Sequence, residues 1–170
     1  MKLNLKRFAQ EPGAVLPFDY ELDLSQVEWC GLRPVTQPVH VEGRVRNMAG
    51  AMLLNARLSA VLSLVCDRCA KAFQREKTVE YETLLAFELE NGEDGDIVLL
   101  DEDGTLELDE LMQEEFLLEM DTKNLCSEDC KGLCAGCGAD LNREGCRCKK
   151  EIDPRLAKLA QLLEDRESNE

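Results

Sequence analysis

The middle of the chain alternates between apolar and polar side chains with a period of two residues. This period is typical of a β-strand, whose successive side chains point to opposite faces of a sheet. One face of the stretch from 51 to 65 is apolar throughout: Met52, Leu54, Ala56, Leu58, Ala60, Leu62 and Leu64. The same period over Val39 to Arg46, a turn at Asn47 to Gly50 and a third strand over Phe73 to Phe87 predict an antiparallel sheet.

Shorter stretches before this sheet are compatible with additional strands. Leu3 to Phe8, Leu16 to Leu24 and Val27 to Leu32 are rich in apolar residues. Nearby prolines keep such strands short or at a sheet edge, because proline lacks the backbone N–H that a central strand donates.

The chain beyond the sheet predicts a loop, a small hairpin and then a helix. Residues 91–96 have the composition of a loop, and Ile97 to Leu100 with Thr105 to Leu108 predict a hairpin around Asp103-Gly104. The helix that follows has an apolar face opposite a row of glutamates, and its expected N-cap is Asp109.

The end of the chain predicts a second helix. Asp153 suits the N-cap and Pro154 the first helical position, and leucines follow at helical spacing. The expected fold class is therefore α+β, an antiparallel β-sheet with a cysteine-rich zinc module and two helices. The expected regions are 1–90 for the sheet and the first cysteine pair, 91–125 for an acidic hairpin and helix, and 126–170 for the metal module and final helix.

Length and composition fit one domain with a small appended module. The chain has 170 residues, of which 44% are hydrophobic, enough to bury a core. Its beginning lacks the uninterrupted apolar run of a secretory signal, and Asn55 and Arg57 interrupt the best apolar stretch. The expected location is cytoplasmic, with no membrane partner.

The acidity of the chain is regional. The formal net charge is −15, but residues 78–122 contain seventeen acidic and no basic residues, which leaves the remainder at +2. An acidic surface repels phosphate, so we expect a nucleic-acid contact only outside residues 78–122.

Nine cysteines are unusual for a reducing compartment, where disulfides do not persist and closely spaced cysteines are more often metal ligands. Cys30 stands apart after Trp29, and we expect it to be a small buried hydrophobic residue. The other eight are clustered: Cys66, Cys69, Cys126, Cys130, Cys134, Cys137, Cys146 and Cys148.

Two C-x2-C pairs indicate metal, because such a turn brings two thiolates to one ion. By chain order the eight cysteines form two four-sulfur sets: Cys66, Cys69, Cys126 and Cys130, and then Cys134, Cys137, Cys146 and Cys148. This arrangement predicts two zinc ions. A rival arrangement pairs the two C-x2-C turns around one ion as a zinc ribbon. An iron–sulfur cluster also suits four cysteines, whereas thiol redox chemistry leaves the other cysteines without a role.

Catalysis finds little support in the sequence. Four thiolates leave no open position on a metal for water, so a structural ion is expected. His40 is the only histidine and reads as an ordinary strand residue, and no phosphate-binding glycine loop is present. We expect no enzymatic activity and no small-molecule substrate.

The cysteine-rich run resembles the YceD family, also called large ribosomal RNA subunit accumulation proteins. The resemblance rests on Cys126-Ser-Glu-Asp-Cys130-Lys-Gly-Leu-Cys134-Ala-Gly-Cys137-Gly-Ala-Asp-Leu-Asn142, on Cys146-Arg-Cys148 and Asp153-Pro-Arg-Leu156, and on Val65-Cys66-Asp67-Arg68-Cys69 upstream. It implies a factor needed for normal levels of large-subunit ribosomal RNA, with a metal site.

Two kinds of partner follow from the charges. Basic loops near the cysteines can track a phosphate backbone, although they can also simply offset the negative thiolates. The candidate RNA-binding residues are Arg68, Lys71, Lys131, Arg143, Arg147, Lys149 and Lys150. Alternatively, the acidic segment binds basic ribosomal proteins or assembly factors without any RNA contact. The sequence leaves the oligomeric state open.

Overall fold

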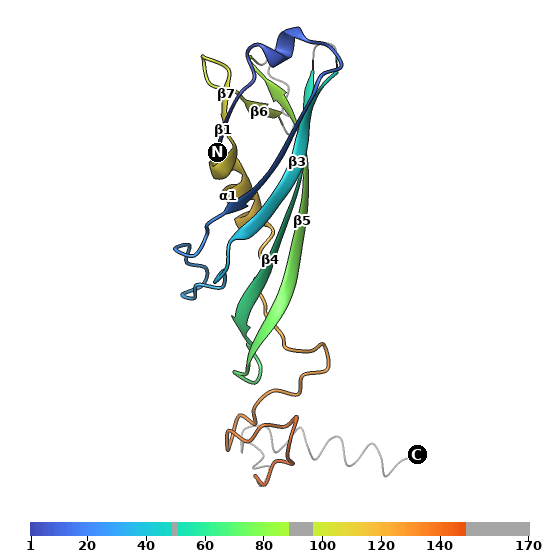
Figure 1. Ribbon diagram of the computed structural model, residues 1–170. Coiled ribbons are helices and arrows are strands. Elements are labelled where there is room, and N and C mark those ends of the chain that lie inside the picture. Colours follow the sequence, from blue (N-terminus) through green and yellow to red (C-terminus); the bar gives the residue numbers. More distant parts are fainter. Residues whose placement is uncertain (49–50, 89–96, 149–170) are drawn as a thin grey trace, which may run out of the picture. The chain divides into compact units, whose positions relative to one another are not determined.

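A computed structural model describes residues 1–48, 51–88 and 97–148 (Figure 1). Their elements are β1 (Lys2–Asn4), a 3₁₀ turn (Phe8–Gln10), β2 (Val15–Leu22), β3 (Val39–Asn47), β4 (Met52–Val65), β5 (Ala72–Ala86), β6 (Ile97–Leu99), β7 (Thr105–Glu107) and α1 (Leu108–Leu118). A five-stranded sheet has the order β2-β3-β4-β5-β6, and β1 and β7 form a second, two-stranded sheet. The fold class is α+β, as predicted.

The three predicted central strands are confirmed. β3 and β5 both pair antiparallel with β4, and the ladder with β5 runs from Met52 opposite Leu85 to Val65 opposite Ala72. The face of β4 that the alternation marked as apolar is buried except for Ala60, which is half-buried.

The core lies against one face of the five-stranded sheet. Leu54 and Leu58 of β4 belong to the same buried cluster as Leu108, Met112 and Phe116, which are fully buried on one side of α1. Figure 1 shows α1 beside the sheet strands. The spacing of these three helix residues places them on one stripe, so the helix is held by apolar packing on that stripe.

The stretches before the central strands are less regular than their apolar content indicates. The predicted strand over Leu3 to Phe8 is shortened to Lys2–Asn4 and followed by the 3₁₀ turn. The stretch Val27 to Leu32 contains only one isolated bridge, between Trp29 and Leu32.

Cys30 is exposed, so its predicted burial is wrong. Cys30 and Gly31 form a two-residue turn with φ of 51° and 78°, and the backbone N–H and carbonyl groups of Trp29 and Leu32 bond across it at 2.8 and 3.0 Å. Two positive φ values are the mark of a type I′ hairpin turn. The tip of such a turn faces solvent, so the apolar neighbourhood along the sequence did not decide where this side chain lies.

The predicted hairpin between residues 97 and 108 is wrong in its pairing. β6 pairs parallel with β5, which makes the large sheet mixed, whereas β7 pairs antiparallel with β1. A turn does form, since the Gly104 N–H donates to the Asp101 carbonyl oxygen at 2.8 Å. The free edges of β5 and β1 supply the backbone partners that the two short strands need.

The helix α1 confirms the first predicted helix but not its cap. It begins one residue before Asp109, and its N-cap is Glu107, which makes no side-chain capping bond. Asp109 and Glu110 lie in the first turn instead, where a negative charge is favourable at the positive end of the helix dipole.

The second predicted helix, starting at Asp153, lies outside the described residues, as does the loop over 91–96.

The chain groups into two compact units. One comprises Met1–Asp67 with Lys71–Cys126 and contains both sheets and α1; the other comprises Arg68–Ala70 with the chain from Ser127 onwards. The described part of the chain has no helix that is long and apolar enough to cross a membrane.

Candidate metal centres

The eight clustered cysteines form two groups of four, and within each group all four sulfur atoms lie within 4.8 Å of one another. The first group, here the buried cluster, is Cys66, Cys69, Cys126 and Cys130; the second, here the exposed cluster, is Cys134, Cys137, Cys146 and Cys148. This is the arrangement that chain order predicts. The ribbon arrangement, which needs the two C-x2-C pairs around one point, is not the grouping that the structure shows.

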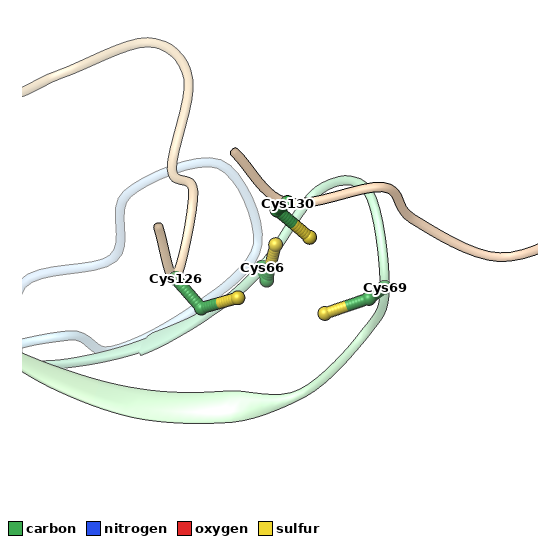
Figure 2. Close-up of side chains that lie close together, drawn as sticks. All are labelled: Cys66, Cys69, Cys126 and Cys130. Carbon is green, nitrogen blue, oxygen red and sulfur yellow. The ribbon is translucent and has the colours of Figure 1, made fainter. Parts of the chain in front are cut away.

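The buried cluster is shielded from solvent. Cys66, Cys69 and Cys130 are 1%, 8% and 2% exposed, and Cys126 is half-buried. The first pair comes from the turn between β4 and β5 and the second pair from the segment after α1, and the four sulfurs converge (Figure 2).

Hydrogen bonds join the two segments that carry the cysteines of the buried cluster. The Asp67 N–H donates to the Asn124 carbonyl oxygen at 2.8 Å, and the Asn124 N–H donates back to Asp67 Oδ2 at 2.6 Å. Arg75 donates to the Leu125 carbonyl oxygen at 2.6 Å. The segment that leads into Cys126 is therefore fastened to Asp67, in the connection between β4 and β5, and to Arg75, near the start of β5.

Arg68, a candidate RNA-binding residue, is engaged within the protein. Its Nη1 donates to the Cys130 carbonyl oxygen at 2.8 Å, and its own carbonyl oxygen accepts the Leu133 N–H at 3.0 Å. Gly132 has a φ of 76°, and a Cβ there would come within 2.9 Å of the Arg68 carbonyl oxygen. The close approach of these two backbones requires glycine at 132.

The exposed cluster is built on a tight hairpin. The Gly138 N–H donates to the Cys134 carbonyl oxygen and the Cys134 N–H to the Ala139 carbonyl oxygen, both at 2.8 Å. The Cys134 sulfur lies 3.1 Å from that of Cys146 and 3.8 Å from that of Cys148. Cys134 is half-buried and its three companions are exposed.

Hydrogen bonding between the thiols of this cluster separates their proton affinities. The Cys146 thiol and the backbone N–H groups of Cys137 and Gly136 lower the pKa of Cys134 to about 6, from an ordinary value of 9.0. The hydrogen bond to Cys134 raises the pKa of Cys146, and hydrogen bonds to Cys137 and Cys146 raise the pKa of Cys148 to about 12. Without a metal, one thiolate is therefore present near neutral pH while two neighbours keep their protons.

Both donor sets fit a tetrahedral ion. Metal–sulfur bonds of about 2.3 Å give sulfur–sulfur edges of about 3.8 Å in a tetrahedron. The Cys134–Cys148 and Cys137–Cys146 separations are 3.8 and 3.9 Å, and the Cys134–Cys146 separation is shorter, at 3.1 Å. Zinc suits four thiolates, and an iron–sulfur cluster uses the same donors. In both cases the four cysteines leave no coordination position open for water.

The remaining candidate RNA-binding residues are exposed where the structure describes them. Lys71, Lys131, Arg143 and Arg147 are exposed, and Arg143 also lies 3.5 Å from an oxygen of Asp140. Lys149 and Lys150 lie outside the described residues. Residues 68–70 and 127–148 contain four basic and four acidic side chains, so this described part has no excess of positive charge.

Two supporting residues were not singled out from the sequence. Asn142 appears there only as the last residue of a motif, yet its side chain donates to the Cys130 sulfur. Asp67 appears only as a residue between two cysteines, yet it bonds Asn124. A polar residue at a fixed place in a cysteine motif is the signal that could have found Asn142.

His40 lies on β3 with its Nδ1 3.1 Å from Glu21 Oε1, consistent with an ordinary strand residue.

Comparison with known proteins gives one family. The family model for the large ribosomal RNA subunit accumulation protein YceD matches residues 54–163, a span that includes all eight clustered cysteines. The uncharacterized protein ML1660 of Mycobacterium leprae is 29% identical, covering 94% of this chain and 76% of the relative. The uncharacterized protein YlbN of Bacillus subtilis is 28% identical over 96% of both chains. No solved structure matches the chain significantly.

Proposed function

The chain belongs to the YceD family of large ribosomal RNA subunit accumulation proteins, and we propose that it is a non-catalytic factor that binds two zinc ions and supports the accumulation of large-subunit ribosomal RNA. The observation that carries the metal part is the convergence of eight cysteine sulfurs into two sets of four. The family description supports the ribosomal part.

The donor chemistry supports a structural role for the metal. Zinc with four thiolates has no position for a water molecule that could act as a nucleophile, so its contribution is folding free energy. Zinc would be held by the buried cluster and by the exposed cluster, one ion in each. Native mass spectrometry with elemental analysis of the purified chain tests this directly. We expect two zinc ions per chain; none, or a metal with inorganic sulfide, would overturn the assignment.

Direct RNA contact is the proposed route to the ribosomal role. Lys131, Arg143 and Arg147 are exposed beside the exposed cluster and are able to reach phosphates. Reversing all three charges to glutamate should weaken a gel shift with large-subunit ribosomal RNA and flatten its dependence on salt. Reversing Arg44, Arg46 and Arg57, which are exposed on the sheet, is the matched control with the same three charge reversals and should leave the shift unchanged. Equal binding by both variants would exclude this route.

An acidic contact with a basic protein is the second candidate, because Glu110 and Glu114 of α1 are exposed on the side away from the core. Changing Glu107, Glu110, Glu114 and Glu115 to glutamine should abolish a pull-down of basic ribosomal proteins. The matched control neutralises four exposed acidic residues of the sheet outside the segment 78–122 instead: Asp19, Glu21, Glu42 and Glu76. Loss of the pull-down in both variants would show that only total charge matters, and retention in both would exclude this candidate.

A further inference from the structure

The side-chain amide of Asn142 has only one orientation that satisfies its neighbours. Its Oδ1 accepts the Lys131 N–H at 2.8 Å, and its Nδ2 donates to Asp140 Oδ1 at 2.8 Å and lies 3.6 Å from Cys130 Sγ. A backbone N–H can only donate and an ionised carboxylate can only accept, so exchanging Oδ1 and Nδ2 would break both strong bonds. The second hydrogen of Nδ2 is therefore left for the Cys130 sulfur.

Asn142 belongs to the chain segment that forms the exposed cluster. Asn142 lies between Cys137 and Cys146, two members of that cluster. The preceding residue, Leu141, donates its N–H to the Gly132 carbonyl oxygen at 3.0 Å, which continues the ladder of the hairpin that holds Cys134. Anything that orders this hairpin consequently orders Asn142 as well.

The sulfur that Asn142 contacts belongs to the other cluster. Cys130 is 2% exposed, so solvent water has little access to replace a lost donor. A sulfur that binds a metal carries negative charge, and a hydrogen-bond donor outside the coordination shell stabilises that charge and fixes the direction of the ligand.

We propose that Asn142 positions Cys130 for metal binding and thereby couples the two clusters, so that a metal in the exposed cluster raises the affinity of the buried cluster. The inference rests on the proposed metal binding. Because coupling between two binding sites is reciprocal, a metal in the buried cluster raises the affinity of the exposed cluster by the same factor.

Cobalt(II) titration of the full chain tests the positioning role, because cobalt bound to thiolates absorbs in the near ultraviolet and visible. Cys148→Ser removes a ligand of the exposed cluster, so this background reports the buried cluster, and Cys66→Ser reports the exposed cluster. Asn142→Asp keeps an acceptor for the Lys131 N–H but removes the donor to sulfur. We expect it to lower the affinity of the buried cluster by about 10- to 100-fold and to leave that of the exposed cluster unchanged within about threefold.

Two further variants separate the lost donor from other effects. Asn142→Ala removes the donor without placing a second carboxylate beside Asp140, and should also weaken the buried cluster. Asn4→Asp makes the same chemical change at an exposed asparagine that contacts no cysteine, and should change neither cluster.

Coupling is measured by comparing the wild type with the single-site variants. The overall constant for loading both ions in the wild type should exceed the product of the two single-site constants by about tenfold, and Asn142→Asp should bring that ratio to about one. If two ions bind but Asn142 variants match the wild type, the coupling inference is wrong while metal binding stands. If the wild type binds no cobalt, the proposed metal-binding function itself is wrong.

Discussion

The buried and exposed clusters offer the same four thiol donors but differ in solvent access and in the chain that supplies them. The exposed cluster closes within the fifteen residues from Cys134 to Cys148, whereas the buried cluster brings the β4–β5 turn to residues nearly sixty positions later. The entropy cost of closing a loop rises with its length, so the buried cluster depends on a folded sheet in a way that the exposed cluster does not.

This difference teaches that identical ligands need not have the same role. Residues around the buried cluster are fixed by bonds from Asp67, Arg68 and Arg75 to backbone groups. At the exposed cluster the sulfurs bond mainly to each other and to the hairpin backbone. A metal in the buried cluster should act on the stability of the whole fold, and a metal in the exposed cluster on local order and on its coupling to the other site.

The largest effect is expected from removing a ligand of the buried cluster. Cys66→Ser should release one metal ion and lower the free energy of unfolding by about 4 kcal/mol, which is the stabilisation that a ligand supplies at one thousand times its dissociation constant. Urea unfolding followed by the circular dichroism of the sheet, with metal analysis alongside, measures both quantities.

Cys148→Ser is the matched control for this change. It also removes one ion, but should cost only about 1.4 kcal/mol, the equivalent of a tenfold coupling to the buried cluster. Equal destabilisation by the two substitutions would show that the clusters do not differ in the way that their burial indicates.

Solvent access should also separate the rates at which the clusters lose metal. A chelator in excess should remove the ions in two kinetic phases, because it reaches sulfurs at the surface without any unfolding. We expect Cys148→Ser to lack the fast phase and Cys66→Ser to lack the slow phase. A single phase in the wild type, or the opposite assignment, would contradict the comparison.

A smaller and local effect concerns the pH dependence of the exposed cluster. In the metal-free protein the pKa of Cys134 is lowered to about 6, so its thiolate is present above that pH and is lost as the pH falls through it. The lowered pKa stabilises the folded state. This stabilisation is fully present above the ordinary pKa of 9.0 and is lost as the pH falls to about 6.

Alkylation with iodoacetamide followed by peptide mapping tests this separation, because only the thiolate reacts. Cys134 should react with a midpoint near pH 6, whereas Cys148, with a pKa of about 12, should react only in alkaline solution. The buried cluster is the internal control, since its sulfurs are shielded and should react slowly at every pH. The same midpoint for Cys134 and Cys148 would refute the hydrogen-bonding arrangement.

The features that the sequence predicted well are those with a local or periodic cause. The alternation from 51 to 65 identified the buried face of β4, because side chains of a strand point to opposite sides whatever lies beyond. The grouping of the cysteines followed from their order along the chain, and the short loop of the exposed cluster is easy to close.

The features that were missed depend on residues far apart in the chain. β6 and β7 were expected to pair with each other, yet each found the free edge of another strand. Nothing in the sequence predicted that Arg68 donates to the Cys130 carbonyl oxygen, sixty-two residues later. Burial of Cys30 was inferred from an apolar setting, and no periodicity marks the turn that exposes it.

Cys30 gives the smallest predicted effect and a contrast with both clusters. Its φ of 51° is unfavourable for most side chains but is tolerated by asparagine, which is preferred before glycine in a type I′ turn. Cys30→Asn should therefore raise the free energy of unfolding by about 0.5 kcal/mol, and Cys30→Val should lower it by about 1 kcal/mol because a β-branched side chain disfavours this conformation. Both variants should keep the metal content of the wild type, which urea unfolding and elemental analysis measure together. A loss of metal in either would mean that this ninth cysteine is tied to one of the clusters, and stabilisation by valine would refute the turn geometry.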